Sequence, residues 1–253
     1  MDRQLLSGIA AVVFDFYGTL TPVSPSTVWA HNSARLAMAM GVPPDALLKV
    51  LDETFPDRIT GATGGLWQTM RALGERLGVQ LTDTQVDEAS RVRREVQESM
   101  FALRPEALPV IEGLRSRGLR IGLLSDCTSE LPDAWSRLPL SGVVDAAVFS
   151  CVEGTRKPDP RLFRKVASEL GAEPSQCLYV GDGGGRELTG ASGLGMRAVL
   201  LAGTDWHEHR GNDREADWTG LRIGSLTELA RLSRSAGVAV AVAAIGGRGF
   251  RVI

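Results

Sequence analysis

Five residues that are far apart in this sequence carry side chains suited to nucleophilic and metal-assisted chemistry. Asp15, Ser125 and Asp182 each come at the end of a short apolar run, while Lys157 and Glu187 lie in segments that follow such runs. An aspartate can act as a covalent nucleophile, and a lysine can balance the negative charge gathered around it. Carboxylates are also ligands that Mg²⁺ prefers, together with water and phosphate oxygens. The set therefore suits attack of an aspartate on phosphorus, provided that the fold brings the five side chains together.

The order of the apolar segments predicts a fold that does so. From residue 104 onward, expected helices and strands alternate, which indicates an α/β fold with a parallel sheet and helices on both faces. The carboxyl ends of parallel strands lie along one edge of a sheet, so side chains at these ends converge. The expected strands are residues 9–14, 119–124, 145–149, 177–180 and 197–201, and the expected helices are residues 105–117, one ending at Gly171 and one ending at Leu194.

Residues 22–103 differ from the rest because they show helical periodicity and no expected strand. Thr82 is a suitable N-cap for the longest of these helices, since Gln85 follows at the position that completes a capping box. The expected helices are residues 28–40, 44–55, 66–77 and 82–103. We expect residues 1–21 and 104–235 to form the α/β core, residues 22–103 a helical cap, and residues 236–253 a C-terminal extension or final strand.

The composition is that of an ordinary globular chain and excludes several classes of partner. The 253 residues are 43% hydrophobic and 23% charged with a formal net charge of −2, so no global basic field attracts nucleic acid or an acidic membrane. The arginines at positions 91, 93 and 94 are expected on a solvated helix face, and Trp29 and Trp67 in the core of the cap. Three separated cysteines and the absence of a recognisable signal peptide predict a cytoplasmic protein. The sequence leaves the oligomeric state open between a monomer and a homodimer.

Taken in order, the four candidate segments resemble the motifs of the haloacid dehalogenase superfamily of hydrolases. Asp15-Phe-Tyr-Gly-Thr19 is similar to the first motif and Ser125 to the second; Lys157 within Lys-Pro-Asp-Pro160 is similar to the third, and Gly181-Asp182 with Glu187 to the fourth. The resemblance covers residues 9–202. It implies a Rossmann-like core with an inserted helical cap of the C1 type.

The resemblance also implies a metal site and a nucleophile. Asp15 would be the nucleophile and a Mg²⁺ ligand, and the backbone carbonyl of Tyr17 would be a second ligand. Asp182 would hold the metal directly or through water, with Glu187 in the neighbouring acidic role. Thr19 would support the nucleophile loop.

Substrate binding is expected from both parts of the chain. The resemblance implies that Ser125, Asp126 and Lys157 bind the phosphoryl group of a small phosphorylated metabolite. Arg58 lies in a stretch of the cap, residues 57–65, that is rich in small and turn-forming residues. It is expected either to contact an anionic end of the substrate or to lie in a surface loop.

One position departs from the pattern of the phosphatases of this superfamily, which usually carry a second aspartate two residues after the nucleophile. Here that position is Tyr17, and a phenol with an ordinary pKa of about 10 is a poor base at neutral pH. General acid–base catalysis contributes about 10²–10⁴ in rate. The sequence therefore predicts a slow phosphatase, one restricted to good leaving groups, or a chemistry that needs no such acid.

Two alternatives stay open beside a Mg²⁺-dependent phosphatase. The Asp-x-Tyr-Gly-Thr form also resembles the 2-haloacid dehalogenases, which need no Mg²⁺ and typically lack the Gly-Asp pair that this chain keeps at Asp182. The other alternative is a family member that binds or regulates without hydrolysis. Its sign would be loss of the nucleophile or the lysine, and both Asp15 and Lys157 are present.

Overall fold

The strand β1 (Ala11–Phe14) lies in the interior of a six-stranded parallel sheet. Val12 and Phe14 belong to the apolar core on one face, whereas Ala11 and Val13 belong to the core on the other. Burial on both faces explains why this strand is a continuous apolar run. This computed structural model of the protein describes residues 5–208 and 214–234. The strand order is β3-β2-β1-β4-β5-β6, with β2 (Arg120–Ser125), β3 (Ala146–Phe149), β4 (Cys177–Gly181), β5 (Arg197–Leu201) and β6 (Leu221–Ile223).

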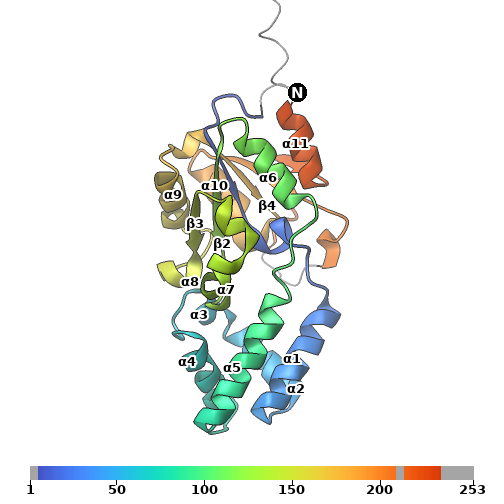
Figure 1. Ribbon diagram of the computed structural model, residues 1–253, viewed down its shortest axis with the longest axis vertical. Coiled ribbons are helices and arrows are strands. Elements are labelled where there is room, and N and C mark those ends of the chain that lie inside the picture. Colours follow the sequence, from blue (N-terminus) through green and yellow to red (C-terminus); the bar gives the residue numbers. More distant parts are fainter. Residues whose placement is uncertain (1–4, 209–213, 235–253) are drawn as a thin grey trace, which may run out of the picture.

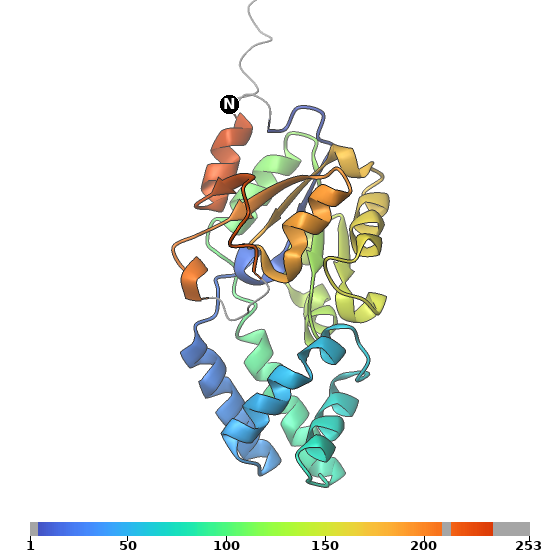
Figure 2. The same cartoon turned by 180° about the vertical axis from the view of Figure 1, so that it is seen from behind.

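Helices cover both faces of this sheet, as Figures 1 and 2 show from opposite sides. On one face α6 (Ala107–Arg115) packs against β2 and against α11 (Leu226–Arg234). On the other face lie α9 (Pro160–Glu169) and α10 (Glu187–Gly193). Two short helices, α7 (Glu130–Ala134) and α8 (Ser150–Glu153), come after β2 and β3. The expected parallel α/β fold is confirmed.

The five expected strands are all present, with ends that differ by at most two residues from the expected ones. The elements that were not expected include β6 and α11. β6 has three residues, of which Leu221 and Arg222 are exposed, so it leaves no apolar pattern in the sequence. The predicted extension at residues 236–253 lies outside the described residues.

The cap consists of the five helices α1 to α5, and it lies at the end of the molecule opposite α11 (Figure 1). Leu36, Leu47, Met70 and Val86 are buried in an apolar core that the cap helices share. The cap therefore has its own core, separate from the two cores that flank the sheet. Its helices are α1 (Ser26–Met40), α2 (Pro44–Glu53), α3 (Phe55–Ile59), α4 (Leu66–Arg76) and α5 (Asp83–Glu98).

The ends of the cap helices follow local chemistry. Thr82 and Gln85 form the expected capping box at the start of α5. The helix expected over residues 44–55 ends at Glu53, and a second helix starts at Phe55. Pro56 explains this break, because proline has no N–H to donate and its ring clashes with the carbonyl one turn earlier. Among the described residues, no helix is long and apolar enough to cross a bilayer.

Candidate active site

Asp15, the candidate nucleophile, follows β1 directly and begins the turn that ends the strand. Its backbone N–H donates to the carbonyl oxygen of Val180 in β4 (2.9 Å), and its side chain is buried. The turn continues through residues 16–20, where Gly18 has a φ of +77°. A Cβ atom at Gly18 would lie 2.4 Å from Oδ2 of Asp182. Only glycine therefore lets the nucleophile turn approach this neighbouring carboxylate.

The ammonium group of Lys157 joins two buried carboxylates. Its Nζ lies 2.7 Å from Oδ1 of Asp15 and 2.5 Å from Oε2 of Glu187. The backbone N–H of Lys157 donates to Oδ1 of Asp126 (3.0 Å), which links its loop to the loop after β2. Burial lowers the pKa of Lys157, but the charges of Asp15 and Glu187 outweigh burial and hold that pKa well above its ordinary value. Lys157 is therefore positively charged at neutral pH.

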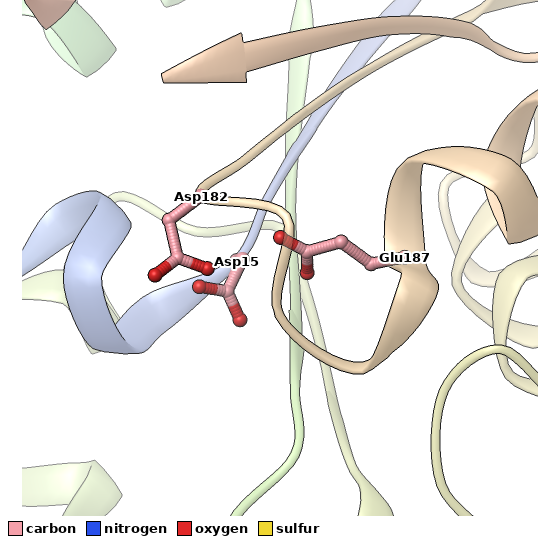
Figure 3. Close-up of side chains that lie close together, drawn as sticks. All are labelled: Asp15, Asp182 and Glu187. Atoms are coloured by element: carbon pink, nitrogen blue, oxygen red, sulfur yellow. The ribbon is translucent and has the colours of Figure 1, made fainter. Parts of the chain in front are cut away.

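Two further carboxylates reach Asp15 from the end of β4 and the start of α10. Asp182 directly follows β4, and Glu187 is the first residue of α10. Glu187 accepts hydrogen bonds from the hydroxyl of Tyr179 (2.7 Å) and the N–H of Gly183 (2.9 Å). One oxygen each of Asp15, Asp182 and Glu187 lies within 4.8 Å of the other two. Figure 3 shows these carboxylates converging from two segments of the chain, the turn after β1 and the connection from β4 to α10.

The three carboxyl groups share an environment that opposes their ionisation. Burial raises the pKa of Asp15 to about 6, and those of Asp182 and Glu187 to about 7. Lys157 acts in the opposite direction on Asp15 and Glu187, while the charge of Glu187 raises the pKa of Asp182 further. One ammonium cannot balance three carboxylates in a buried site. The cluster is therefore suited to a cation.

Two hydroxyl residues are buried close to this acidic cluster. Ser125 ends β2 and Thr19 lies in the nucleophile turn, and neither is exposed. The Ser125 hydroxyl has no hydrogen-bond partner among the described residues. Because buried hydroxyls normally have a partner, this one is consistent with a bound oxyanion at the end of β2.

A cavity of about 650 Å³ lies between the cap and the core. Ser125, Thr19 and Glu187 are not part of its wall, so the structure places them behind the residues that face it. The core contributes a polar wall, and the cap a mostly apolar one. From the core come Asp15, Tyr17, Asp126, Lys157 and Asp182; the cap side includes Trp29, Asp52, Phe55, Ile59 and Gln97.

Tyr17 lines this cavity, and the cap holds its hydroxyl. Nε2 of Gln97, in α5, donates to the phenol oxygen of Tyr17 at 3.1 Å. Burial raises the pKa of Tyr17 well above its ordinary value, and the nearby Cys127 acts in the same direction. Since the amide donates to the phenol oxygen, the phenol keeps its own proton for another acceptor. Tyr17 can therefore donate a hydrogen bond into the site but cannot act as a base at neutral pH.

Arg58 lies in a helix and not in a loop, because α3 continues to Ile59. Its guanidinium donates to the carbonyl oxygen of Leu51 (2.5 Å) and to the hydroxyl of Thr54 (3.2 Å), and the side chain is buried. Burial lowers the pKa of Arg58 to about 9. It is not among the residues that line the cavity, so the structure places it behind the cap wall.

A buried ion pair joins the cap to the core. Arg93 in α5 lies 2.6 Å from Glu130 in α7, and their side chains are 7% and 3% exposed. Burial raises the pKa of Glu130, but Arg93 outweighs it and holds the pKa below its ordinary value. The expectation that Arg93 faces solvent with Arg91 and Arg94 is therefore wrong, because the core covers one side of α5.

The sequence patterns assign no role to Arg104 and Asp205, which hold the nucleophile turn in place. Arg104 donates to the carbonyl oxygens of Gly18 and Thr19, both at 3.0 Å. It also lies 2.8 Å from Oδ2 of Asp205, which accepts from the N–H of Val23 (2.8 Å). The pair therefore connects the two segments that join the cap to the core, at Val23 and at Arg104, to the turn that carries Asp15. No local signal marks it, since its two members are 101 residues apart.

The chain is similar over most of its length to proteins that are named as hydrolases. It is 29% identical over 199 residues to phosphatase MT3486 of Mycobacterium tuberculosis, which covers 76% of this chain and 87% of that protein. It is 24% identical over 235 residues to (S)-2-haloacid dehalogenase 4A of Burkholderia cepacia, which covers 89% of this chain and 95% of that one. The fold matches 2-haloacid dehalogenase from Pseudomonas syringae pv. Tomato DC3000 with a TM-score of 0.66 at 22% identity, over 89% of this chain and 98% of that chain.

A family profile gives the family, within which these pairwise likenesses include both a phosphatase and a dehalogenase. The profile of the haloacid dehalogenase-like hydrolases matches residues 9–195. That range contains the cap and the four segments that meet at one edge of the sheet. The chain belongs to the haloacid dehalogenase-like hydrolases and is an enzyme of that family.

Proposed function

We propose that this protein is a cytoplasmic, magnesium-dependent phosphatase that hydrolyses the phosphate monoester of a small metabolite through a covalent intermediate on Asp15. The observation that carries the proposal is the contact of Lys157 Nζ with both Asp15 and Glu187 in a buried site. A charged ammonium favours ionised Asp15, which is the nucleophilic form, and attracts a dianionic phosphoryl group. The similarity to phosphatase MT3486 supports the same reaction class.

Mg²⁺ fits the acidic cluster on chemical grounds. Three buried carboxylates with oxygens within 4.8 Å of one another offer the hard oxygen ligands that this ion prefers. Glu187 already accepts hydrogen bonds on both of its oxygens. We therefore assign metal binding to Asp15, Asp182 and the backbone carbonyl of Tyr17, and to Glu187 mainly the positioning of Lys157. A bound Mg²⁺ would stabilise negative charge on the phosphoryl oxygens as a Lewis acid.

The proposed reaction has two steps. In the first, a carboxylate oxygen of Asp15 attacks phosphorus in line with the leaving oxygen, so the bond to the alcohol breaks and an aspartyl phosphate forms. Lys157, which lines the cavity, holds the phosphoryl oxygens during this transfer, and Ser125 supports the site from behind the cavity wall. In the second, water attacks the same phosphorus, which releases inorganic phosphate and restores Asp15. The cap limits the access of bulk water to the covered cavity.

Hydrolysis of a carbon–halogen bond is the second candidate function. It is supported by Tyr17, which stands where phosphatases of this superfamily usually carry an aspartate, and by the similarity to haloacid dehalogenase 4A. In that reaction Asp15 would displace halide from carbon, and water would hydrolyse the resulting ester. The acidic cluster around Asp182 favours the phosphatase, since displacement of halide needs no metal.

Release of phosphate and of chloride, measured in parallel, separates these functions. We expect the purified protein to release phosphate from a panel of phosphate esters with Mg²⁺, and to lose this activity with EDTA or in Asp15→Asn. Chloride release from 2-chloropropionate that is indifferent to EDTA would identify a dehalogenase instead. Neither product from the wild type would favour a non-hydrolytic role, and wild-type phosphate release by Asp15→Asn would refute the nucleophile.

A further inference from the structure

Two of the three cysteines, which are well separated in the sequence, meet beside the active site. Sγ of Cys127 lies 4.0 Å from Sγ of Cys151, although the two residues are 24 positions apart. Cys127 follows β2 and is buried, whereas Cys151 lies in α8 and is partly exposed. We propose that this pair is a site of reversible oxidation by peroxides, and that the disulfide formed there switches the hydrolase off.

The sheet itself brings the two cysteines together. The neighbouring strands β2 and β3 are parallel, with Ser125 opposite Phe149, and each cysteine comes two residues after its member of this pair. Neighbouring strands are about 4.8 Å apart, which lies within the range of about 4.4–6.8 Å that a disulfide spans between Cα atoms. Since a disulfide bond is about 2.0 Å long, the two sulfur atoms must approach each other by about 2 Å.

The two thiols differ in the way that oxidation by a peroxide requires. The hydrogen bond with the thiol of Cys127 lowers the pKa of Cys151 and outweighs burial and the charge of Glu130, which act in the opposite direction. Burial raises the pKa of Cys127 well above its ordinary value. The thiolate is the form that reacts with a peroxide. Cys151, which is also the more exposed of the two, therefore reacts first, and Cys127 keeps its proton until the second step.

The oxidation has two balanced steps. The Cys151 sulfur attacks one oxygen of hydrogen peroxide, the O–O bond breaks, and the other oxygen leaves as water with the proton that the thiol has lost, so Cys151 becomes a sulfenic acid. The Cys127 sulfur then attacks the Cys151 sulfur, and the hydroxyl group leaves as a second water with the proton of Cys127. Two thiols are oxidised to one disulfide, and one peroxide is reduced to two waters. A dithiol reductant reverses the change.

Movement of Cys127 acts on the catalytic lysine. Cys127 lines the cavity, and Asp126, directly before it, accepts a hydrogen bond from the backbone N–H of Lys157 at 3.0 Å. That bond holds the loop whose ammonium group contacts Asp15. A shift of about 1 Å in a reacting group can lower a rate by about 100-fold. We therefore expect the disulfide to slow hydrolysis by at least about tenfold.

The same movement reaches the cap through Ser150, the residue before Cys151. The Ser150 hydroxyl accepts from the N–H of Cys127 (2.9 Å) and donates to the carbonyl oxygen of Ile59, at the end of α3 (2.6 Å). Gly61 lies so close to Cys151 that a Cβ atom there would overlap the Cys151 carbonyl oxygen. The disulfide therefore forms where the cap contacts the core, and its formation displaces both.

Peptide mapping tests the site. The reduced protein is treated with a small excess of hydrogen peroxide, alkylated and digested without reductant. We expect a cross-linked pair of peptides that contains Cys127 and Cys151, and we expect dithiothreitol to remove the cross-link. Cys151→Ser should give no cross-link, while Cys177→Ala, the matched control, should give the wild-type one. Wild-type protein without this cross-link, or with a link between the Cys151 residues of two chains, would refute the site.

Hydrolysis before and after the same treatment tests the switch. On the substrate of the panel that the wild type cleaves fastest, the oxidised wild type should be at least about tenfold slower, and dithiothreitol should restore its rate. Cys151→Ser should have the same rate before and after peroxide. Equal rates for the reduced and the cross-linked wild type would overturn the switch.

Hydrogen–deuterium exchange gives a readout that needs no substrate, so a failure of the proposed phosphatase function leaves it intact. Oxidation should speed exchange in the peptides that contain the N–H groups of Cys127 and Lys157, because the acceptors of these groups are displaced. Unchanged exchange in the cross-linked protein would overturn the proposed route from Cys127 to Lys157.

Discussion

The carboxylate of Asp182 destabilises the metal-free protein at neutral pH, so its replacement by asparagine should stabilise the fold. The side chain is 2% exposed, and burial, with the charge of Glu187, raises the pKa of Asp182 from 3.8 to about 7. A carboxyl group whose pKa is higher in the folded state binds its proton more tightly there. The folded state therefore loses stability as pH rises from about 4 to about 7, and the full penalty is present above that range.

The size of the effect follows from the shift. About three pKa units at about 1.36 kcal/mol each set an upper limit of ~4 kcal/mol at pH 8. Structural relaxation and water penetration reduce such penalties, so we expect Asp182→Asn to raise the free energy of unfolding by about 1–3 kcal/mol at pH 8. Asparagine keeps an oxygen that can accept the hydrogen bond from the N–H of Gly184 (3.0 Å). The gain should shrink toward pH 4, where the wild-type carboxyl group is protonated in the folded state and close to its own pKa of 3.8 in the unfolded state.

Urea unfolding in EDTA, followed by circular dichroism at pH 5 and pH 8, measures this difference. Asp217→Asn, which changes an exposed carboxylate, is the control and should leave the free energy of unfolding nearly unchanged. Added Mg²⁺ should raise the Tm of the wild type more than that of Asp182→Asn, because a ligand that binds only the folded state stabilises it. A loss of stability in Asp182→Asn at pH 8, or an equal gain at both pH values, would refute the reasoning.

Three further substitutions test how the core and the cap position the site. Gly18→Ala forces a Cβ into Oδ2 of Asp182 at a positive φ, so it should lower the free energy of unfolding by about 1–3 kcal/mol and abolish phosphate release; wild-type turnover would contradict this. Glu130→Gln leaves Arg93 buried without its partner and should lower the free energy of unfolding in urea by about 3–5 kcal/mol, against at most about 1 kcal/mol for Glu98→Gln in an exposed pair. Arg104→Lys removes the guanidinium that donates to two carbonyl oxygens of the nucleophile turn. We expect steady-state kinetics to show a kcat lower by about 10- to 100-fold, which is the size of effect expected when a reacting group is misplaced. Arg115→Lys is the control.

Much of the core was predictable because its signals are local. The strand before Asp15 is buried on both faces, so every residue in it is apolar. The start of α5 directly after Thr82 was predictable because its capping box depends on two residues only three positions apart. β6 was not predicted, because an edge strand of three residues is too short to show an alternation of apolar and polar residues. Pro56 is a local signal for the break between α2 and α3. The apolar pattern of the segment nevertheless predicted one continuous helix.

The positions of charged side chains in the cap could not be predicted from such local signals. Arg93 has the charged neighbours of a solvated helix face, and only the packing of α5 against α7 buries it against Glu130. Arg58 stands near turn-forming residues, yet the cap turns its guanidinium inward to the Leu51 carbonyl. Whether a charged side chain faces solvent, substrate or protein depends on neighbours from elsewhere in the chain.

The order of residues along the chain was sufficient to define a parallel α/β fold and to mark Asp15, Ser125, Lys157, Asp182 and Glu187, because strand periodicity and strand-end chemistry are written in short segments. The folded arrangement alone decided that Lys157 lies between Asp15 and Glu187, that Gln97 reaches Tyr17, and that an arginine and an aspartate 101 residues apart hold the nucleophile turn. These contacts join distant parts of the chain through packing and buried charge. Their energies depend on distance in space and on the exclusion of water. The spacing of residues along the chain gives neither quantity.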